Sequence, residues 1–308
     1  MAFTAFRDTH PFSQFVLSIF IIIVCFILFL VGSIILAIPL FGLDSISAIP
    51  TLDNLTNPDS IRILKYFQVV QSIGLFIIPP FIIAWLFKGQ IAEYLLLNKK
   101  ITGIGVVLVI LLIFFANPAI NYIGSLNTRM VFPSWLSWME EWMRSAEDKA
   151  AVLTEAFLDV KTIPGLMFNL FMIAFLPAIG EELVFRGVIQ KIFTDWTKNA
   201  HLGIWISAII FSAFHLQFYG FMPRLLLGVL FGYLLVWSGS MWLPIIAHFV
   251  NNAAAVIAMW MVSQDKIDPA IEEIGATSES LYIAVISFFM SIALLFLIKS
   301  HKKFQKTS

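Results

Sequence analysis

The chain has 308 residues, of which 60% are hydrophobic and only 12% are charged, and its mean hydropathy is +0.92. A soluble domain carries about 25% charged residues, so the composition predicts an all-α polytopic membrane protein, built as a single integral membrane domain over residues 1–308. The net charge is zero, which excludes the basic surface that nucleic-acid binding needs. The single cysteine, Cys25, excludes an internal disulfide and a cysteine-based metal cluster.

Apolar runs long enough to cross a bilayer follow one another along the chain. A transmembrane helix needs about 20 mostly apolar residues. By this rule the sequence predicts eight spans, at about 15–41, 61–87, 101–121, 164–193, 200–218, 221–238, 241–263 and 280–299. Pro79 and Pro80 are expected to kink the second span, because proline lacks the N–H that a helix uses.

One polar segment, from about Asn127 to Ile163, separates the third span from the fourth. Apolar side chains recur within it at helical spacing, and they are Trp135, Met139, Trp142, Ala146, Ala150, Leu153 and Phe157. Tryptophan-rich amphipathic helices lie in the membrane interface. We expect an interfacial helix that serves as a connector on the bilayer, and the alternative is a lid or substrate-guiding element beside a site.

Basic residues indicate the orientation of the chain, because cytoplasmic loops carry an excess of lysine and arginine. They gather after the second span, after the fourth span and in the C-terminal tail, as Lys88, Lys99, Lys100, Lys191, Lys198, Lys299, Lys302, Lys303 and Lys306. The loop before the last span is acidic instead and includes Asp265, Asp268 and Glu279. With eight spans, this distribution predicts that both termini are cytoplasmic, in the cell membrane if the source is bacterial.

Two adjacent carboxylates and an arginine lie inside the fourth predicted span. Ionisable residues at membrane depth are costly and mark candidate functional sites. Glu182 and Arg186 are four residues apart, so they share a helix face and are expected to pair. Glu181 points about 100° away and has no such partner, which suits a general base. Pro177 cannot donate to the carbonyl of Ile173, so a loosened turn is expected beside Glu181.

Two later spans offer partners for Glu181. His215 lies late in the fifth predicted span, while His248 and Asn252 are four residues apart in the seventh and share a face. A lone histidine in a membrane helix more often serves packing or pore polarity. Two histidines together with an amide and a Glu-Glu-x-x-x-Arg stretch make coincidence a weaker explanation.

The motifs Glu181-Glu182-x-x-x-Arg186, Phe211-x-x-x-His215 and His248-x-x-x-Asn252, in this order on successive spans, resemble those of the CPBP family. This family of CAAX proteases and bacteriocin-processing enzymes, also called Abi, includes the eukaryotic type 2 CAAX prenyl endopeptidase. The resemblance covers roughly residues 175–255, inside a motif-bearing core of about 164–263.

The resemblance implies an intramembrane, glutamate-dependent endopeptidase. Its substrate would be a membrane-associated polypeptide, such as a lipidated tail or a leader peptide. Carried over by position, Glu181 would activate a water with help from His215, His248 and Asn252 would stabilise the oxyanion, and Glu182 and Arg186 would brace the site. Peptide hydrolysis needs such a base near the water and such donors near the developing oxyanion.

Three alternatives stay open. Glu181, His215 and His248 also form a plausible zinc set with Glu182 as a base, although no His-Glu-x-x-His pattern is present, so we expect no cofactor. A non-enzymatic immunity or binding protein of the same fold would use the same residues to hold a partner. A proton-coupled transporter also places Glu and His at depth, but transporters often show paired halves and the first half has no matching Glu-Glu stretch.

Overall fold

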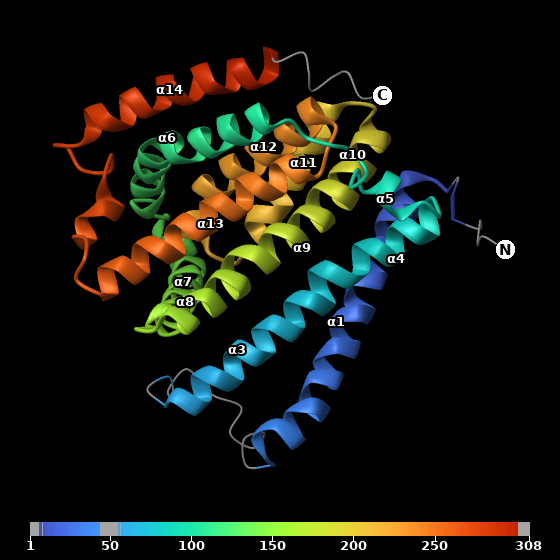
Figure 1. The fold of residues 1–308 in the computed structure, drawn as a ribbon, viewed down its shortest axis with the longest axis horizontal. Coiled ribbons are helices and arrows are strands. Elements are labelled where there is room, and N and C mark those ends of the chain that lie inside the picture. Colours follow the sequence, from blue (N-terminus) through green and yellow to red (C-terminus); the bar gives the residue numbers. More distant parts are fainter. Residues whose placement is uncertain (1–5, 8, 44–54, 56, 301–308) are drawn as a thin grey trace.

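The structure, a computed structural model, describes residues 6–7, 9–43, 55 and 57–300. The lysines of the C-terminal tail on which the predicted orientation partly rests, Lys302, Lys303 and Lys306, lie outside these ranges. Within them the elements are helices, shown in Figure 1. The α-helices are α1 (Pro11–Phe41), α3 (Pro58–Ser72), α4 (Ile78–Phe87), α5 (Ile91–Tyr94), α6 (Gly103–Thr128), α7 (Ser137–Leu158), α8 (Ile163–Asn169), α9 (Leu176–Val184), α10 (Gln190–Thr197), α11 (Ala200–Phe214), α12 (Phe221–Ser238), α13 (Trp242–Ser263) and α14 (Leu281–Ser300). The π-helical segments are η2 (Ile73–Ile77), η4 (Leu170–Phe175) and η5 (Phe185–Ile189), and the short 3-10 segments are η3 (Ser134–Leu136), η6 (Phe218–Gly220) and η7 (Pro269–Glu273).

The all-α membrane fold is confirmed, with one difference in the number of spans. Among the described residues, seven helices are long and apolar enough to cross a membrane, against the eight predicted. The difference lies in the fifth predicted span, because α11 has only 15 residues. A helix of that length is about 22 Å long, short of the roughly 30 Å of a bilayer core. The helix stops at Phe214, and Leu216 then takes a φ of 55°, which an α-helix cannot accommodate.

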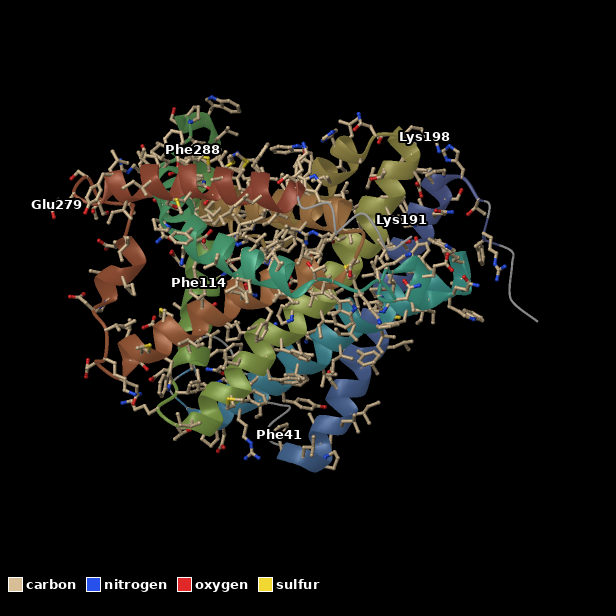
Figure 2. All side chains as sticks on the ribbon, turned by 45° about the horizontal axis from the view of Figure 1, so that its top comes forward. Phe41, Phe114, Lys191, Lys198, Glu279 and Phe288 are labelled. Atoms are coloured by element: carbon tan, nitrogen blue, oxygen red, sulfur yellow. The ribbon has the colours of Figure 1, made fainter. Side chains whose placement is uncertain are left out.

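The outside of the bundle has the character that lipid would require. Large apolar side chains on α1 and α14, among them Phe20, Leu28, Phe289 and Phe296, are exposed. Figure 2 shows Lys191 and Lys198 at one end of the molecule and Glu279 at the opposite end. The cytoplasmic placement of both termini stays a prediction.

The fourth span is a composite helix. Residues Ile163–Thr197 run through α8, η4, α9, η5 and α10, so a short α-helical piece with both motif glutamates lies between two π-helical turns. Single π-turns inside α-helices are frequent at functional sites. The loosened turn expected from Pro177 is present as η4, which ends two residues before this proline.

The second span is interrupted in a similar way. The π-turn η2 directly precedes α4, whose first turn contains Pro79 and Pro80. Two consecutive prolines leave two carbonyls of the preceding turn without their usual donors, which accounts for the break. The turn η2 packs directly on α9. This close approach depends on Gly180, because a Cβ there would lie 2.6 Å from Cβ of Phe76 and 3.2 Å from its carbonyl carbon.

Replacement of Gly180 by alanine is therefore expected to force η2 and α9 apart. Overpacking of this kind costs about 1–3 kcal/mol, and the displaced backbone is the one that carries Glu181. We expect a lower midpoint of thermal unfolding for Gly180→Ala in detergent. Gly32→Ala is the matched control, because a Cβ on Gly32 meets no atom within 4 Å. Equal midpoints for the two variants would contradict the proposed tight contact.

The polar segment between the third and fourth spans forms α7, as predicted. Its N-terminal half exposes Trp138 and Trp142. Its C-terminal end is anchored by Lys65 of α3, whose Nζ donates to the carbonyl of Phe157 (2.8 Å) and to Oδ1 of Asn169 (3.0 Å). The Nδ2 group of Asn169 donates to the same Phe157 carbonyl at 2.8 Å. These bonds fix α7 against α3 and α8.

Candidate active site

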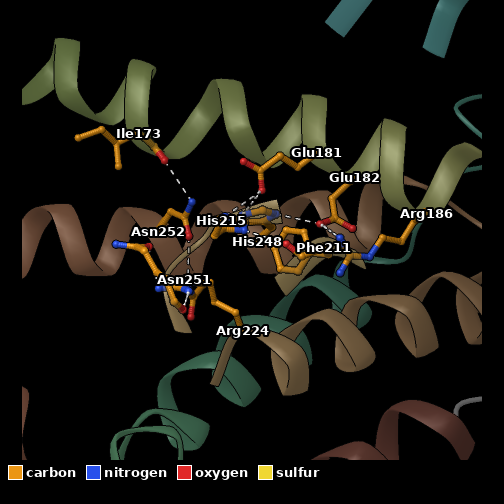
Figure 3. A network of polar contacts seen from close by, with 11 residues as sticks. Ile173, Glu181, Glu182, Arg186, Phe211, His215, Arg224, His248, Asn251 and Asn252 are labelled. Carbon is orange, nitrogen blue, oxygen red and sulfur yellow. Dashed lines mark hydrogen bonds and ion pairs between the residues drawn. The ribbon is translucent and has the colours of Figure 1, made fainter. Parts of the chain in front are cut away.

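Three predicted site residues from three different helices meet at one point. Oε2 of Glu181, on α9, lies 4.0 Å from Nε2 of His215 at the end of α11 and 3.9 Å from Nε2 of His248 on α13. Figure 3 shows the carboxylate of Glu181 above the two imidazole rings. The three motifs, which follow one another along the chain, thus bring these side chains together in space, as expected.

Each imidazole is held through its other nitrogen. Nδ1 of His215 lies 2.9 Å from the carbonyl of Phe211, which can only accept, so this nitrogen carries a proton. Nδ1 of His248 lies 2.8 Å from Oε1 of Glu182 and donates to that carboxylate. Both rings are thereby turned so that Nε2 faces Glu181. A hydrogen bond at the second ring nitrogen is how histidine sites fix the orientation and tautomer of the ring.

Glu182 and Arg186 form the ion pair that their spacing predicts. Nη1 of Arg186 lies 2.9 Å from Oε1 of Glu182, and both side chains are completely buried. Nη2 donates to the carbonyl of Gly228 on α12 at 2.9 Å. The guanidinium carbon lies 4.6 Å from the ring centre of Phe211 and 5.4 Å from that of Phe231, so two aromatic faces cover the charge.

Phe231 has a second contact that concerns the site. Its ring stacks on His248, with centroids 5.1 Å apart and an interplanar angle of 19°. Polar contacts also connect the charged residues in one network: Arg186 pairs with Glu182, Glu182 binds Nδ1 of His248, and Nε2 of His248 faces Glu181. In this network Glu182 orients His248, beyond its predicted pairing with Arg186.

The side chain of Asn252 supplies a hydrogen-bond donor that Pro177 lacks. Its Nδ2 group donates to the carbonyl of Ile173 at 3.1 Å, the carbonyl that a residue other than proline at 177 would engage. Its Oδ1 accepts from Nδ2 of Asn251 at 3.2 Å. One of the two N–H groups of Asn252 thus ties α13 to η4, and the second N–H remains for a ligand.

The oxygen of Glu181 at the meeting point lacks a partner. Oε2 is buried and makes no hydrogen bond in the described part of the chain. Buried polar atoms are nearly always satisfied, and here two imidazole nitrogens about 4 Å away face the same gap. A water with hydrogen bonds of about 2.8 Å to two such atoms spans this separation when the bonds diverge by about 90°.

The same three atoms can be compared with a zinc site. Two imidazoles and a carboxylate have the right chemistry, but two ligands at about 2.1 Å from a tetrahedral ion lie about 3.4 Å apart. The separations of 3.9 and 4.0 Å are wider than that. Nor does any group of three His, Cys, Asp or Glu residues in the described ranges have metal-binding spacing. The arrangement fits a water better than an ion.

The cluster opens into a cavity of about 400 Å³. Glu181, His215, His248 and Asn252 line it, together with Leu153, Thr154 and Phe157 of α7. The expectation that α7 is only a connector on the bilayer is therefore wrong, because its C-terminal half forms a wall of this cavity. The reason is tertiary: the contacts of Lys65 and Asn169 with Phe157 draw that end of the helix to the site.

One charged residue of the cavity was not predicted from the sequence. Arg224 of α12 lines it opposite the motif residues, with the neighbouring amide of Asn251. A signal was present in the sequence, because Arg224 is an ionisable residue inside the sixth predicted span. Phe231, by contrast, has no signal that distinguishes it among 31 phenylalanines.

Comparison with known proteins agrees with these motifs. Residues 163–254 match the family model described as type II CAAX prenyl endopeptidase Rce1-like. An uncharacterized protein of Bacillus subtilis (strain 168), YpbD, is 31% identical over 118 residues, which are 36% of this chain and 56% of that protein. An uncharacterized 24.3 kDa protein of Escherichia coli is 30% identical over 102 residues, or 31% of this chain and 46% of that protein.

These similarities are confined to one part of the molecules. The matched segments span about half the length of the two curated relatives. No solved structure matches the chain. The resemblance predicted from the three motifs is nevertheless confirmed, because residues 163–254, which match the Rce1-like family model, hold all three of them.

Proposed function

We propose that this protein is an intramembrane endopeptidase that hydrolyses a peptide bond of a membrane-associated polypeptide. The observation that supports it best is the buried, unpartnered Oε2 of Glu181, which faces Nε2 of both His215 and His248 across a water-sized gap. The Rce1-like match over the same residues supports the same class of enzyme. The substrate is a lipidated tail or a leader peptide, and the enzyme lies in the cell membrane if its source is bacterial.

The proposed reaction starts with a water in the gap. Glu181 takes a proton from it, assisted by His215, and the hydroxide attacks the scissile carbonyl carbon. When the carbon–nitrogen bond breaks, the proton passes from Glu181 to the leaving amine. No metal or cofactor takes part.

Two groups are positioned for the oxyanion. Asn252 contributes the N–H that does not bind Ile173, and this donor adds no charge to the cavity. His248 donates from Nε2 only when both ring nitrogens carry protons, because Nδ1–H already binds Glu182. The carboxylate of Glu182 accepts the Nδ1–H bond of that form and stabilises it, much as a buried aspartate does for a catalytic histidine.

The proposal is tested by adding the purified protein to membranes from its source in water enriched in oxygen-18. Hydrolysis by an activated water predicts new polypeptide C-termini that carry the heavy oxygen and appear only with the protein. Mass spectrometry of the products measures this. The absence of labelled termini would leave a non-enzymatic immunity or binding role in the lead.

Removal of metal ions separates the two hydrolytic mechanisms. We expect cleavage to continue at an unchanged rate after dialysis against EDTA and 1,10-phenanthroline, because Glu181 and His215 activate the water without a metal ion. The zinc mechanism predicts that the same treatment abolishes cleavage and that added zinc restores it. A loss that zinc reverses would therefore overturn the metal-free mechanism while leaving the hydrolase in place.

A further inference from the structure

Arg224 is a cation that lines the cavity, and its guanidinium is in direct contact with no carboxylate of the described residues. Its Nη1 donates to the backbone carbonyl of Gln217 at 2.8 Å, and its Nη2 donates to Oε1 of the same residue at 2.7 Å. Among the residues that the structure describes, no carboxylate lies within 4.0 Å of the guanidinium. Arg186, by contrast, is completely buried and forms an ion pair with Glu182 at 2.9 Å. Glu147 and Glu181 act on the guanidinium from a longer distance, so Arg224 brings to the cavity wall a positive charge that no carboxylate contacts directly.

The guanidinium is held in place rather than free to move. Both anchoring bonds come from Gln217, which precedes η6, and the group lies close against the backbone of that turn. A Cβ on Gly220 would lie only 2.5 Å from Nη2, so the glycine leaves the space that the guanidinium occupies. A guanidinium has five N–H donors, and the two bonds to Gln217 leave three of them for another ligand.

The surroundings of Arg224 define what that ligand is. Arginine prefers planar anions that it can bind with two parallel hydrogen bonds, which is the geometry of a carboxylate. The same cavity holds Glu181 and is lined by the apolar side chains of Leu227, Phe231 and Met172. Figure 3 shows Arg224 on α12, across the network from Glu181 on α9. An apolar peptide with one carboxylate would both pair with Arg224 and pack against these apolar side chains.

We propose that Arg224 is a specificity-determining residue that binds a carboxylate of the polypeptide substrate and so places the scissile bond over Glu181. This inference rests on the proposed hydrolase function. The carboxylate is either the free C-terminus of the substrate or an acidic side chain near the cut. Both sources have the same chemistry, and the experiment below distinguishes them.

Binding is measured without turnover in Glu181→Gln protein, reconstituted in detergent. The probes are three fluorescent palmitoyl tetrapeptides: Gly-Leu-Leu-Leu with a free carboxylate, the same peptide as its amide, and Gly-Leu-Leu-Asp as its amide. Because charge-assisted hydrogen bonds are lost in the plain amide, we expect one of the two acidic probes to bind about 10–100-fold more tightly than it. The tighter of the two acidic probes identifies the source of the carboxylate.

The role of Arg224 is then isolated by substitution. In Glu181→Gln protein that also carries Arg224→Gln, the acidic probes are expected to bind as weakly as the plain amide, whose own affinity does not change. Arg224→Lys should retain part of the preference, and Arg129→Gln, at an exposed arginine beyond α6, should retain all of it. Equal affinities of all three probes for the parent protein would overturn the inference, as would a loss of plain-amide binding in Arg224→Gln. Neither result depends on cleavage, so a failure of the hydrolase proposal is seen separately.

Discussion

Replacement of Glu181 by glutamine is expected to reduce peptide cleavage about 10²–10⁴-fold, the usual contribution of a general base. The amide is isosteric with the carboxylate, but it cannot take a proton from the water in the gap between His215 and His248. Binding of substrate should survive, because the shape of the cavity does not change. The measurement is the cleavage rate of purified protein at saturating substrate, compared with the wild type.

A matched control separates this effect from a general loss of negative charge. Glu141 lies on the exposed side of α7, and Glu141→Gln is expected to cleave at the wild-type rate. Undiminished cleavage by Glu181→Gln would remove the general base from the mechanism and, with it, the physical basis of the hydrolase proposal.

Substitution of Arg186 by methionine is expected to have the largest effect on stability of any single change in the network. Removal of one partner of a buried ion pair leaves an uncompensated charge and costs about 3–5 kcal/mol. Here the carboxylate of Glu182 would keep only its bond to His248. We expect a large drop in the midpoint of thermal unfolding and a low yield of folded protein, both measured by size-exclusion chromatography after heating.

The double variant Glu182→Met/Arg186→Met shows whether the charge itself is responsible. Apolar residues of similar volume often replace a buried ion pair without loss of stability, so the double variant should recover most of the midpoint that Arg186→Met loses. Cleavage should stay low, because Nδ1 of His248 has lost the carboxylate that orients its ring. A double variant that is as unstable as the single one would show that packing around Phe211 and Phe231, rather than charge, explains the loss.

The features that could be predicted from the sequence are those fixed by local geometry. The spacing of Glu182 and Arg186 dictates a shared helix face, and their pair is present at 2.9 Å. Pro177 must leave the carbonyl of Ile173 without its helical donor, and the side-chain amide of Asn252 donates to that carbonyl instead. The apolar runs give most of the helices because each needs only its own residues to be long and apolar.

The features that escaped prediction depend on contacts between distant segments. The hydropathy of 200–218 says nothing of Leu216, whose positive φ ends α11 early. The attachment of α7 to the site depends on Lys65, which lies 92 residues from Phe157 in the chain. Arg224 stands alone in its span, so its place in the cavity follows only from the packing of α12 beside α11.

The ion pair between Glu182 and Arg186 also bears on how the fourth span enters the membrane during synthesis. Both partners belong to one composite helix, Ile163–Thr197, so they can neutralise each other as soon as that helix forms. The isolated span then enters the membrane with an ion pair instead of two separate ions. Each separate ion would cost about 2.5–3.5 kcal/mol at the bilayer centre. The bonds of this pair to Gly228 and His248 come from segments that leave the ribosome later. We therefore expect the site to assemble in order: the charged helix enters the membrane first, and its partners on α12 and α13 join it afterwards.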